Sequence, residues 1–438
     1  MSDAPIVKPV PVSGFPEWLP GIRAVEQNWL DRIRATFERY GFCSVETPSV
    51  ESLDVLAAKG ETSQEVYALR RLQAEAGDDS GRLGLHFDLT VPFARYVAAH
   101  FNELTFPFRR YQIQRVWRGE RPQEGRFREF TQCDIDVINA DTVPLYFDAE
   151  LPRIVHEVLT DLAVPAWTLN VNNRKLLQGF YEGLGIADPV AVIRAADKLD
   201  KIGADGVEKL LVDAVGLSAA QARAVLDLAA VKADGSAGVV EAVGRLGVKS
   251  DLLAQGVDEL SFVLDELADL PAGSVVADLS IARGLDYYTG TVYEAKFVDW
   301  PGFGSICSGG RYDDLAGSYI RRHLPGVGIS IGLTRIFAKL VAEGLITPGP
   351  ASPADVLVVI PSDERRRDAV ATAARLRARG LKVETYHQAD KIKKQMAYAS
   401  RKGIGAVWFP PFEDGKDHEV KNMTTGDQVS ADPETWTH

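Results

Sequence analysis

The chain has 438 residues, a formal net charge of −12, 46% hydrophobic residues and 25% charged residues. This composition is ordinary for a soluble globular protein, and it excludes a peptide hormone, a charged tail and a disordered chain. At roughly 150 residues per domain, the length predicts about three structural units.

The N-terminal part predicts a helix, a strand and a long hairpin. Apolar residues at helical spacing indicate an amphipathic helix over residues 25–40, followed by Gly41. Residues 42–47 alternate like a strand that stops before a proline. Strand-like stretches at 111–117 and 127–138 flank a charged loop, which predicts an antiparallel hairpin.

The middle of the chain changes from a helical pattern to strand-like ones. Residues 173–255 are rich in Ala, Leu, Val, Asp and Lys at helical period, which indicates an inserted helical subdomain. Strand-like patterns return at 275–279, 291–298 and 305–307. A strand running into a helix is predicted over 328–340, so the first core resumes there.

A proline-rich connector at 347–353 precedes a C-terminal region in which strands and helices alternate. The predicted order is strand, helix, strand, helix, strand, at residues 355–360, 363–379, 381–386, 391–402 and 406–409. This order is typical of a small α/β domain with a mainly parallel sheet.

Positive charge concentrates in two regions of this acidic chain. Residues 365–402 carry twelve Lys and Arg against three acidic residues, an excess of +9. Residues 108–128 carry seven arginines and two glutamates; the arginines are Arg109, Arg110, Arg115, Arg118, Arg121, Arg126 and Arg128. Both regions are candidates for binding anions.

Several kinds of site are not expected. The apolar runs are far shorter than the roughly 20 residues of a membrane-spanning helix, and the N-terminus lacks a signal pattern, so we expect a cytoplasmic protein without a membrane segment. The three cysteines are isolated and the seven histidines show no ligand spacing. We therefore expect neither disulfides nor a protein-bound metal. Phosphate-loop and dinucleotide glycine motifs are also missing.

The arginine hairpin is the first candidate for chemistry. Side chains two apart in a strand point the same way, so Arg126 and Arg128 are predicted to share a face. The same holds for Gln132, Asp134 and Asp136. Arginines beside carboxylates and amides can hold a phosphate together with a small polar or cationic substrate. A solvated hairpin with cross-strand ion pairs is the alternative.

Two further strings combine glycine with polar and aromatic residues. The first is Ala-Arg-Gly-Leu-Asp-Tyr-Tyr-Thr-Gly at 282–290, and the second is Ser-Gly-Gly-Arg-Tyr-Asp at 308–313. Paired glycines let the backbone approach a ligand closely. Taken alone, each string is equally compatible with an ordinary turn.

Taken together, these strings resemble the histidyl-tRNA synthetases, a family of class II aminoacyl-tRNA synthetases, from about residue 15 to residue 434. Trp117-Arg118-Gly119-Glu120 resembles motif 2 of that class. Residues 283–290 and 308–313 resemble the two histidine-specific strings, and residues 328–335 resemble motif 3. The helix and strand that end before Pro48 resemble motif 1, the dimer-forming element.

The resemblance implies a fold and a division of the chain. The expected fold is an α+β catalytic domain with an antiparallel class II synthetase sheet, a helical insertion and a C-terminal α/β (βαβαβ) anticodon-binding domain. The catalytic core is expected at residues 1–172 and 256–345, with the helical insertion between them at 173–255. A linker is expected at 346–354 and the anticodon-binding domain at 355–438.

The activity implied by the resemblance is that of a histidine–tRNA ligase. ATP would activate L-histidine to histidyl-adenylate with release of pyrophosphate, and the histidyl group would pass to the 3′ end of tRNA(His). Mg²⁺ bound with ATP and a homodimer are implied in the same way. Phosphoryl transfer needs mainly positioning and charge neutralisation, which suits the arginines.

The resemblance also implies roles for residues at the nucleotide. Arg118 is expected to hold the α-phosphate and Arg126 the polyphosphate. Phe130 and Arg335 would sandwich the adenine, with Glu120 near the base. Arg283, at the position of the family's catalytic arginine, would contact the α-phosphate and the substrate carboxylate.

The implied histidine-binding residues form a second set. Asp88 and Thr90 would bind the amino group and Gln132 would orient the amino acid. Asp136 and Tyr288 would read the imidazole, and Tyr287 would line the pocket. Family members often have Glu at the positions of Asp88 and Asp136, and usually Glu at that of Thr334. A pocket that hydrogen bonds both ring nitrogens rejects side chains that lack them.

The C-terminal region is expected to contact tRNA phosphates through Lys393, Lys394 and Arg401, the alternative being a solvated helix face. The helical insertion would either clasp the acceptor stem or serve only as a packing appendage. Two other functions remain: a catalytically inactive regulatory paralogue from histidine biosynthesis, and a nucleic-acid-binding module. The intact arginine and tyrosine strings argue against both, and against a class II synthetase for another amino acid.

Overall fold

The computed structural model describes residues 7–57, 65–73, 82–281, 288–314 and 316–438. These residues form two compact units, one of residues 7–16 and 29–342 and the other of residues 17–28 and 343–438. Helix α1 (Pro20–Arg39) begins in the second unit and ends in the first. Among the described residues, no helix is long and apolar enough to cross a bilayer.

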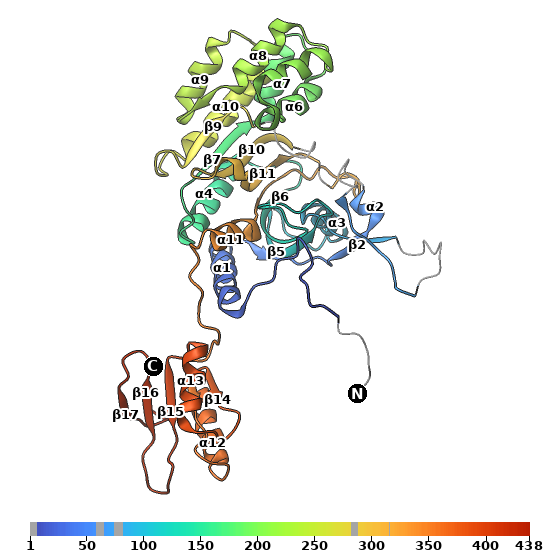
Figure 1. The fold of residues 1–438 in the computed structure, drawn as a ribbon. Coiled ribbons are helices and arrows are strands. Elements are labelled where there is room, and N and C mark those ends of the chain that lie inside the picture. The colour runs from blue at the N-terminus through green and yellow to red at the C-terminus, as the bar shows by residue number, and fades with distance from the viewer. Residues whose placement is uncertain (1–6, 58–64, 74–81, 282–287, 315) are drawn as a thin grey trace. The chain divides into compact units, whose positions relative to one another are not determined.

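A nine-stranded sheet organises the first unit (Figure 1). Only the β1–β5 and β7–β9 pairs are parallel, and the other ladders are antiparallel. The strands, in spatial order, are β1 (Cys43–Ser44), β5 (Phe108–Trp117), β6 (Glu129–Ile138), β12 (Gly326–Ile331), β11 (Ser305–Tyr312), β10 (Tyr288–Phe297), β7 (Trp167–Asn173), β9 (Val275–Asp278) and β8 (Lys232–Ala233). The predicted mainly antiparallel catalytic sheet is therefore confirmed.

Helices and a small sheet cover this framework. The elements are α2 (Leu53–Leu56), α3 (Thr90–Ala99), α4 (Tyr146–Asp161), α11 (Leu333–Ala342), the short helix η2 (Pro301–Phe303) and the sheet β2 (Val50–Ser52), β4 (Leu83–Leu85), β3 (Ala68–Leu69). Helix α1 packs its Trp29 ring edge-on against Phe337 of α11, with 5.4 Å between ring centroids. Phe37 of α1 is fully buried, which confirms the predicted amphipathic helix.

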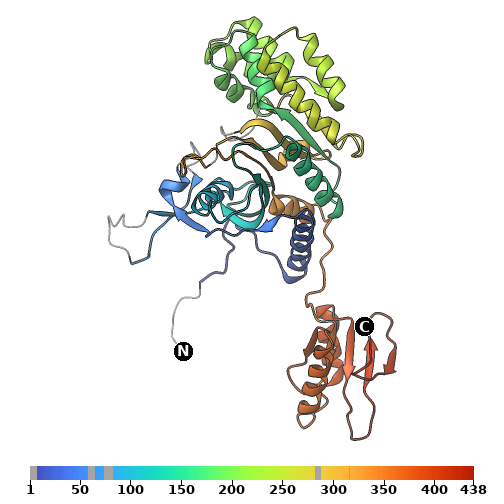
Figure 2. The ribbon, with the colours of Figure 1, turned by 180° about the vertical axis from the view of Figure 1, so that it is seen from behind.

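Six helices follow β7 along the chain. They are α5 (Arg174–Gly183), α6 (Pro189–Ala196), α7 (Leu199–Asp213), α8 (Ala219–Ala229), α9 (Gly235–Arg245) and α10 (Asp251–Glu266). Helices α5 and α10 pack closely: a Cβ at Gly179 would lie 2.2 Å from the amide nitrogen of Leu253. Figures 1 and 2 show α6–α10 grouped beside β7 and β9. The helical pattern is thus confirmed, and the domain boundaries stay a prediction.

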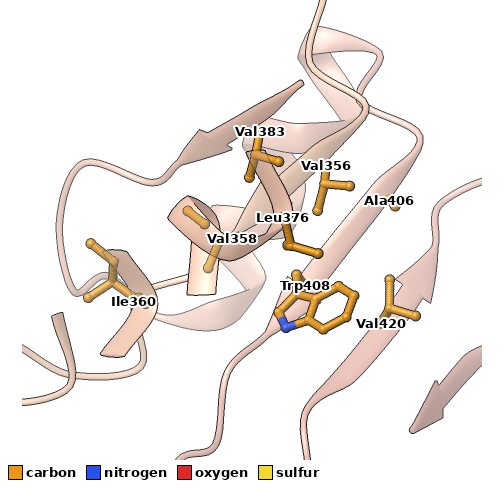
Figure 3. Close-up of a cluster of buried hydrophobic side chains, with 10 residues drawn as sticks. Val356, Val358, Ile360, Leu376, Val383, Ala406, Trp408 and Val420 are labelled. Carbon is orange, nitrogen blue, oxygen red and sulfur yellow. The ribbon is translucent and has the colours of Figure 1, made fainter. Parts of the chain in front are cut away.

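The second unit contains a five-stranded sheet in the order β14 (Val383–Thr385), β13 (Val356–Val358), β15 (Ala406–Phe409), β16 (Glu419–Asn422), β17 (Gln428–Ser430), with helices α12 (Arg366–Ala378) and α13 (Ile392–Lys402). The first three strands are parallel and the last two antiparallel. Val356 and Val358 pack with Leu376 of α12 and Trp408 (Figure 3). Leu357 packs on the other face with Ala399 of α13. Alternate residues of β13 therefore serve two cores.

One predicted strand is shorter than expected, and two observed strands were not predicted. Within residues 42–47, only Cys43–Ser44 form a strand, because one short parallel pairing with β5 is all that this segment makes. Strands β16 and β17 were not predicted. Their residues are largely exposed, and Val420 is the one buried position among them, so the sequence shows no apolar alternation there.

Candidate active site

A pocket lies on adjacent strands of the large sheet. Asp134 of β6 pairs with Ser330 of β12, and Asp136 pairs with Gly328. A Cβ at Gly328 would lie 2.0 Å from Asp136 Oδ1, so glycine leaves the room that this carboxylate needs. The pocket is lined by Thr90, Asp134, Asp136, Tyr288, Ser308, Gly309, Tyr312, Gly328, Ile329 and Ser330. These strands thus gather residues from distant parts of the chain.

Asp136 is held by two neighbours. Arg110, on β5, is fully buried, and its Nη2 lies 2.6 Å from Asp136 Oδ2. The Tyr312 hydroxyl donates to Asp136 Oδ1 at 3.0 Å. Arg110 also lies over the Phe93 ring, with 4.1 Å between Cζ and the ring centroid. The structure therefore fixes the position of Asp136 before any ligand is bound.

Three buried carboxyl groups lie in or beside the pocket, close to the guanidinium groups of Arg110 and Arg118. Asp88, Asp134 and Asp136 are each at most 5% exposed, and Arg110 influences all three. Burial raises the pKa of Asp88 and Asp136, and it raises the pKa of Asp134 to about 7. Since the three acidic groups outnumber the two arginines, the site favours a ligand that brings positive charge or N–H donors.

Spare acceptors are present beside the pocket. Asp88 Oδ1 accepts from the Val91 amide at 3.1 Å just ahead of α3, which begins at Thr90. Gln132 donates to the Ser330 hydroxyl at 2.8 Å. Asp88 Oδ2 and Gln132 Oε1 are buried without a hydrogen-bond partner among the described residues. Buried polar atoms in native proteins are almost always bonded, so a ligand ammonium group suits them.

The arginine at the end of β5 connects two parts of the site. Arg118 Nε donates to the carbonyl of Phe87 at 3.0 Å, the residue before Asp88. Its guanidinium lies over the Phe130 ring, with 5.1 Å from Cζ to the centroid. A ligand that moves Arg118 would therefore also move the segment that carries Asp88.

The hairpin loop differs from the predicted arrangement. Strand β6 begins at Glu129, so Arg126 and Arg128 precede the strand and do not share a face by strand alternation. They instead converge on Glu120: Arg126 Nη1 lies 3.3 Å from Glu120 Oε2, and Arg128 Nε donates to the Glu120 carbonyl at 3.1 Å. Both arginines remain near Arg118 in the chain.

The hairpin loop between β5 and β6 contacts α11 through an ion pair and contacts η2 through the Phe303 ring. Lys339 Nζ lies 2.7 Å from Glu124 Oε1 and 5.6 Å from the Phe303 ring centroid. Arg335 lies over the same ring at 4.9 Å and donates to the Phe303 carbonyl. Gly125 has φ 68° and leaves no room for a Cβ beside Phe303. The sandwich of Phe130 and Arg335 stays a prediction.

Sequence reasoning gave no role to Arg110, Tyr312, Phe303 or Lys339. Arg110 pairs with Asp136 only in the observed register of β5 and β6. That register depends on the length and shape of the loop, which the alternation of residues does not determine. Tyr312 was visible in the string at 308–313, but nothing in the sequence indicated its partner.

Known proteins match this chain over its full length. A family model described as histidyl-tRNA synthetase matches residues 14–336. A histidine–tRNA ligase of Thermobifida fusca is 71% identical over 437 residues, which cover 100% of both chains. The chain belongs to the histidyl-tRNA synthetase family.

Other histidyl-tRNA synthetases support the same assignment. A histidine–tRNA ligase of Bifidobacterium animalis subsp. lactis is 48% identical over 98% of this chain and 96% of its own. The crystal structure of histidyl-tRNA synthetase from Nostoc sp. PCC 7120 superposes with a TM-score of 0.84 at 36% identity, covering 97% of both chains. The expected class II fold, with its C-terminal α/β domain, is confirmed.

One solved structure with the same fold has a composite description. It is described as an ATP phosphoribosyltransferase regulatory subunit/histidyl-tRNA synthetase from Bacillus halodurans, and it superposes with a TM-score of 0.74 at 21% identity. At that identity, the likeness shows the fold alone. The choice between a synthetase and a regulator therefore rests on the full-length identity of 71% to a histidine–tRNA ligase, which shows ligase activity.

The histidyl-tRNA synthetase residues predicted from the sequence are distributed unevenly over the structure. Thr90, Asp136 and Tyr288 line the pocket, and Asp88 and Gln132 provide buried acceptors. Arg283 and Tyr287 lie outside the described residues. The structure therefore brings together part of the predicted histidine-binding set and leaves the catalytic arginine untested.

The basic stretch at residues 365–402 presents less free positive charge than its sequence suggests, because several of its cations form ion pairs. Arg365 pairs with Asp414 at 2.6 Å, Arg375 with Glu434 at 2.5 Å and Lys394 with Asp390 at 2.8 Å. Lys393, Lys394 and Arg401 are all exposed on α13. Of these three, Lys393 and Arg401 take part in none of the ion pairs found among the described residues.

Proposed function

We propose that this chain charges tRNA(His) with L-histidine in two steps. The histidine carboxylate attacks the α-phosphate of ATP to form histidyl-adenylate and pyrophosphate, and the terminal ribose hydroxyl of the tRNA then takes the histidyl group. The full-length identity of 71% to a histidine–tRNA ligase carries this proposal. The acidic pocket, with unbonded acceptors for an ammonium group, supports it.

The nucleotide is assigned to the hairpin side of the site. Arg118 holds the α-phosphate, Arg126 the polyphosphate, and Phe130 and Arg335 stack on the adenine, with Glu120 nearby. Mg²⁺ enters with ATP and lowers the negative charge of its phosphates. Arg283 contacts the α-phosphate and the histidine carboxylate, and it neutralises the charge that develops between them.

Histidine is assigned to the acidic pocket. Its ammonium group meets Asp88, Thr90 and Gln132, where two buried acceptors lack partners among the residues the structure describes. Asp136 and Tyr288 line the side-chain end of the pocket, and Tyr287 is assigned to the same wall. Rejection of other amino acids follows because an apolar side chain leaves these polar groups unpaired.

A charging assay tests the proposed function directly. Purified protein with ATP, Mg²⁺ and radiolabelled histidine is expected to label a tRNA(His) transcript and not a tRNA(Phe) transcript. Periodate-oxidised tRNA(His), which lacks the terminal diol, is the control and should accept no label. Absence of label on intact tRNA(His) would favour the regulatory paralogue.

We also propose that the domains follow the predicted boundaries and that the enzyme is a cytoplasmic homodimer that uses motif 1. The second unit is proposed to bind the anticodon part of tRNA(His). Lys393 and Arg401 are its best phosphate contacts, because they are exposed and free of the ion pair that holds Lys394.

The phosphate contacts give a salt-dependent prediction. The double variant Lys393→Ala/Arg401→Ala is expected to reduce the slope of log affinity for tRNA against log salt by about 1–2, since each phosphate contact contributes roughly 0.7–0.9. Filter binding at several salt concentrations measures this slope. The matched control is Lys416→Ala/Lys421→Ala in the same unit. Equal slopes for the two double variants would contradict these contacts.

A second prediction concerns the contact between the hairpin loop and α11. Lys339→Met removes the ion pair with Glu124 and the cation over Phe303, so the loop that carries Arg126 is less well positioned. The KM for ATP is expected to rise by about 3–5-fold, because Lys339 is 9% exposed but Glu124 is 73% exposed, and such pairs contribute about 1 kcal/mol or less. The KM for histidine should change by less than about 3-fold. An unchanged KM for ATP would show that the ion pair does not position the loop.

A further inference from the structure

One carboxyl group of the pocket has no role in the assignments above. Asp134 lies on β6 between Gln132 and Asp136, lines the pocket, and is 3% exposed. Its Oδ1 atom is buried and has no hydrogen-bond partner among the described residues. A buried acceptor of this kind in a native protein calls for an explanation.

The polar groups next to Asp134 leave its Oδ1 atom without a donor. Gln112, its cross-strand partner on β5, donates its amide to Thr47 Oγ1 at 3.0 Å and to Gln114 Oε1 at 2.7 Å. An amide has only two N–H donors, so Gln112 has none left for Asp134. Ser330, its partner on β12, stabilises the charged carboxylate and accepts from Gln132.

The nearest cation is also committed. Arg110 Nη2 lies 2.6 Å from Asp136 Oδ2, and Arg110 Nη1 donates to Gln112 Oε1 at 3.3 Å. Asp136 receives Arg110 on one oxygen and the Tyr312 hydroxyl on the other. Of these two neighbouring carboxyl groups on β6, Asp134 therefore keeps the larger unused capacity to accept a hydrogen bond.

We propose that Asp134 is a further specificity-determining residue, which hydrogen bonds to a ring N–H of the substrate imidazole beside Asp136, whose oxygens also hold Arg110 and Tyr312. This proposal rests on the proposed function. A carboxylate accepts a hydrogen bond, and a protonated carboxyl donates one. Asp134 therefore matches an imidazole nitrogen in either protonation state. An apolar side chain would leave Oδ1 unpaired, which adds to discrimination.

Asp134→Asn tests the proposal with almost no change of shape. In ATP–pyrophosphate exchange, the KM for histidine is expected to rise by about 5–20-fold, because the amide oxygen of asparagine can still accept a hydrogen bond but lacks the charge that strengthens it. The KM for ATP should stay within about 2-fold. Glu129→Gln is the matched control, because Glu129 lies on the same strand, pairs with Arg115 at 2.9 Å and is not among the residues that line the pocket.

Ring-methylated histidines separate recognition of the imidazole from a merely structural effect. Inhibition constants are measured for the two isomers methylated on one or the other ring nitrogen. In the wild type, methylation of the ring nitrogen that hydrogen bonds to Asp134 is expected to weaken binding. In Asp134→Asn, the weakening caused by this methylation should be smaller by at least about 5-fold, and for this isomer only. Calorimetric binding gives the same comparison if exchange by the variant is too slow to measure.

The outcomes are separable. Two results would overturn the role of Asp134: a KM for histidine of Asp134→Asn within about 2-fold of wild type, or a methylation effect on binding that is the same for both isomers in both proteins. In either case, exchange by the wild type with histidine would still support the proposed function. No exchange by the wild type with histidine would overturn the proposed function itself. Asp134→Ser, measured in parallel, should show the same selective reduction of the methylation effect for one isomer.

Discussion

Replacement of Arg118 by alanine is expected to lower kcat/KM in histidine-dependent ATP–pyrophosphate exchange by about 10³-fold. The α-phosphate gains charge in the transition state, and a preorganised guanidinium stabilises that charge. Arg118 also donates to the Phe87 carbonyl at 3.0 Å, next to Asp88. Its loss therefore weakens the nucleotide side of the site and loosens the segment that binds the ammonium group.

Two variants define what the Arg118 result means. Arg118→Lys should recover little activity, because an ammonium group lacks the planar fork that bonds a phosphate and the Phe87 carbonyl together. Arg115→Ala is the matched control, since Arg115 lies on β5 just ahead of Arg118 and has a side chain that is 61% exposed. A loss of less than about 10-fold in Arg118→Ala would contradict its assignment to the α-phosphate.

Replacement of Arg110 by methionine is expected to destabilise the first unit by about 3–5 kcal/mol. Arg110 is fully buried, and its removal leaves Asp136 without the cation that lies 2.6 Å away. Asp88 and Asp134 lose the same positive neighbour. Urea unfolding followed by tryptophan fluorescence measures the effect.

A double variant identifies the cause of this destabilisation. Arg110→Met/Asp136→Asn should recover part of the stability, because the unpaired charge is then removed. Arg153→Met is the control: Arg153 pairs with Asp269, whose side chain is 67% exposed, and such pairs contribute at most about 1 kcal/mol. If the double variant were as unstable as the sum of both single changes, buried charge would not be the cause.

The difference in stability between the wild type and the Asp134→Asn variant is expected to depend on pH, because only Asp134 titrates. Burial raises the pKa of Asp134 from 3.8 to about 7, so the folded protein binds this proton more tightly than the unfolded chain. Its contribution to stability is therefore complete below 3.8 and is lost as the pH rises to about 7. The groups that face Asp134 are Arg110 from β5, Asp136 from β6, Ser330 from β12, Cys307 from β11 and Asp88 ahead of α3.

Because asparagine does not titrate, the difference in Tm between variant and wild type should increase in favour of the variant from pH 4 to about pH 7 and then level off. Thermal unfolding in a series of buffers measures it. The other carboxyl groups are present in both proteins and largely cancel. A difference that stays constant over this range would contradict the raised pKa.

The sequence predicted strands β5 and β6 and the strand that runs into α11 well, because each carries a clear apolar period, whereas α3, α4 and β7 were not predicted. The hairpin of β5 and β6 is the best example. Its loop was less predictable: β6 begins at Glu129, so Arg126 and Arg128 meet at Glu120 instead of sharing a strand face. Charged residues near a turn show no period that locates the end of a strand.

The candidate site was predictable as a set of residues and not as a network. Alternation placed Gln132, Asp134 and Asp136 on one face, which agrees with the contacts of all three around Ser330 and Gly328. It did not show that Asp136 is already paired with Arg110, or that Asp134 keeps an unbonded oxygen. Those facts depend on strand register and on side chains from other strands.

The most direct test of the central claim is ATP–pyrophosphate exchange measured with each of the twenty amino acids. Exchange with histidine alone, abolished in Arg283→Ala, is the result that a histidine-activating site predicts. Arg121→Ala, another arginine of the charged region but without an assigned role, should retain exchange. Exchange with a different amino acid, or with none, would contradict the assignment of the acidic pocket to histidine.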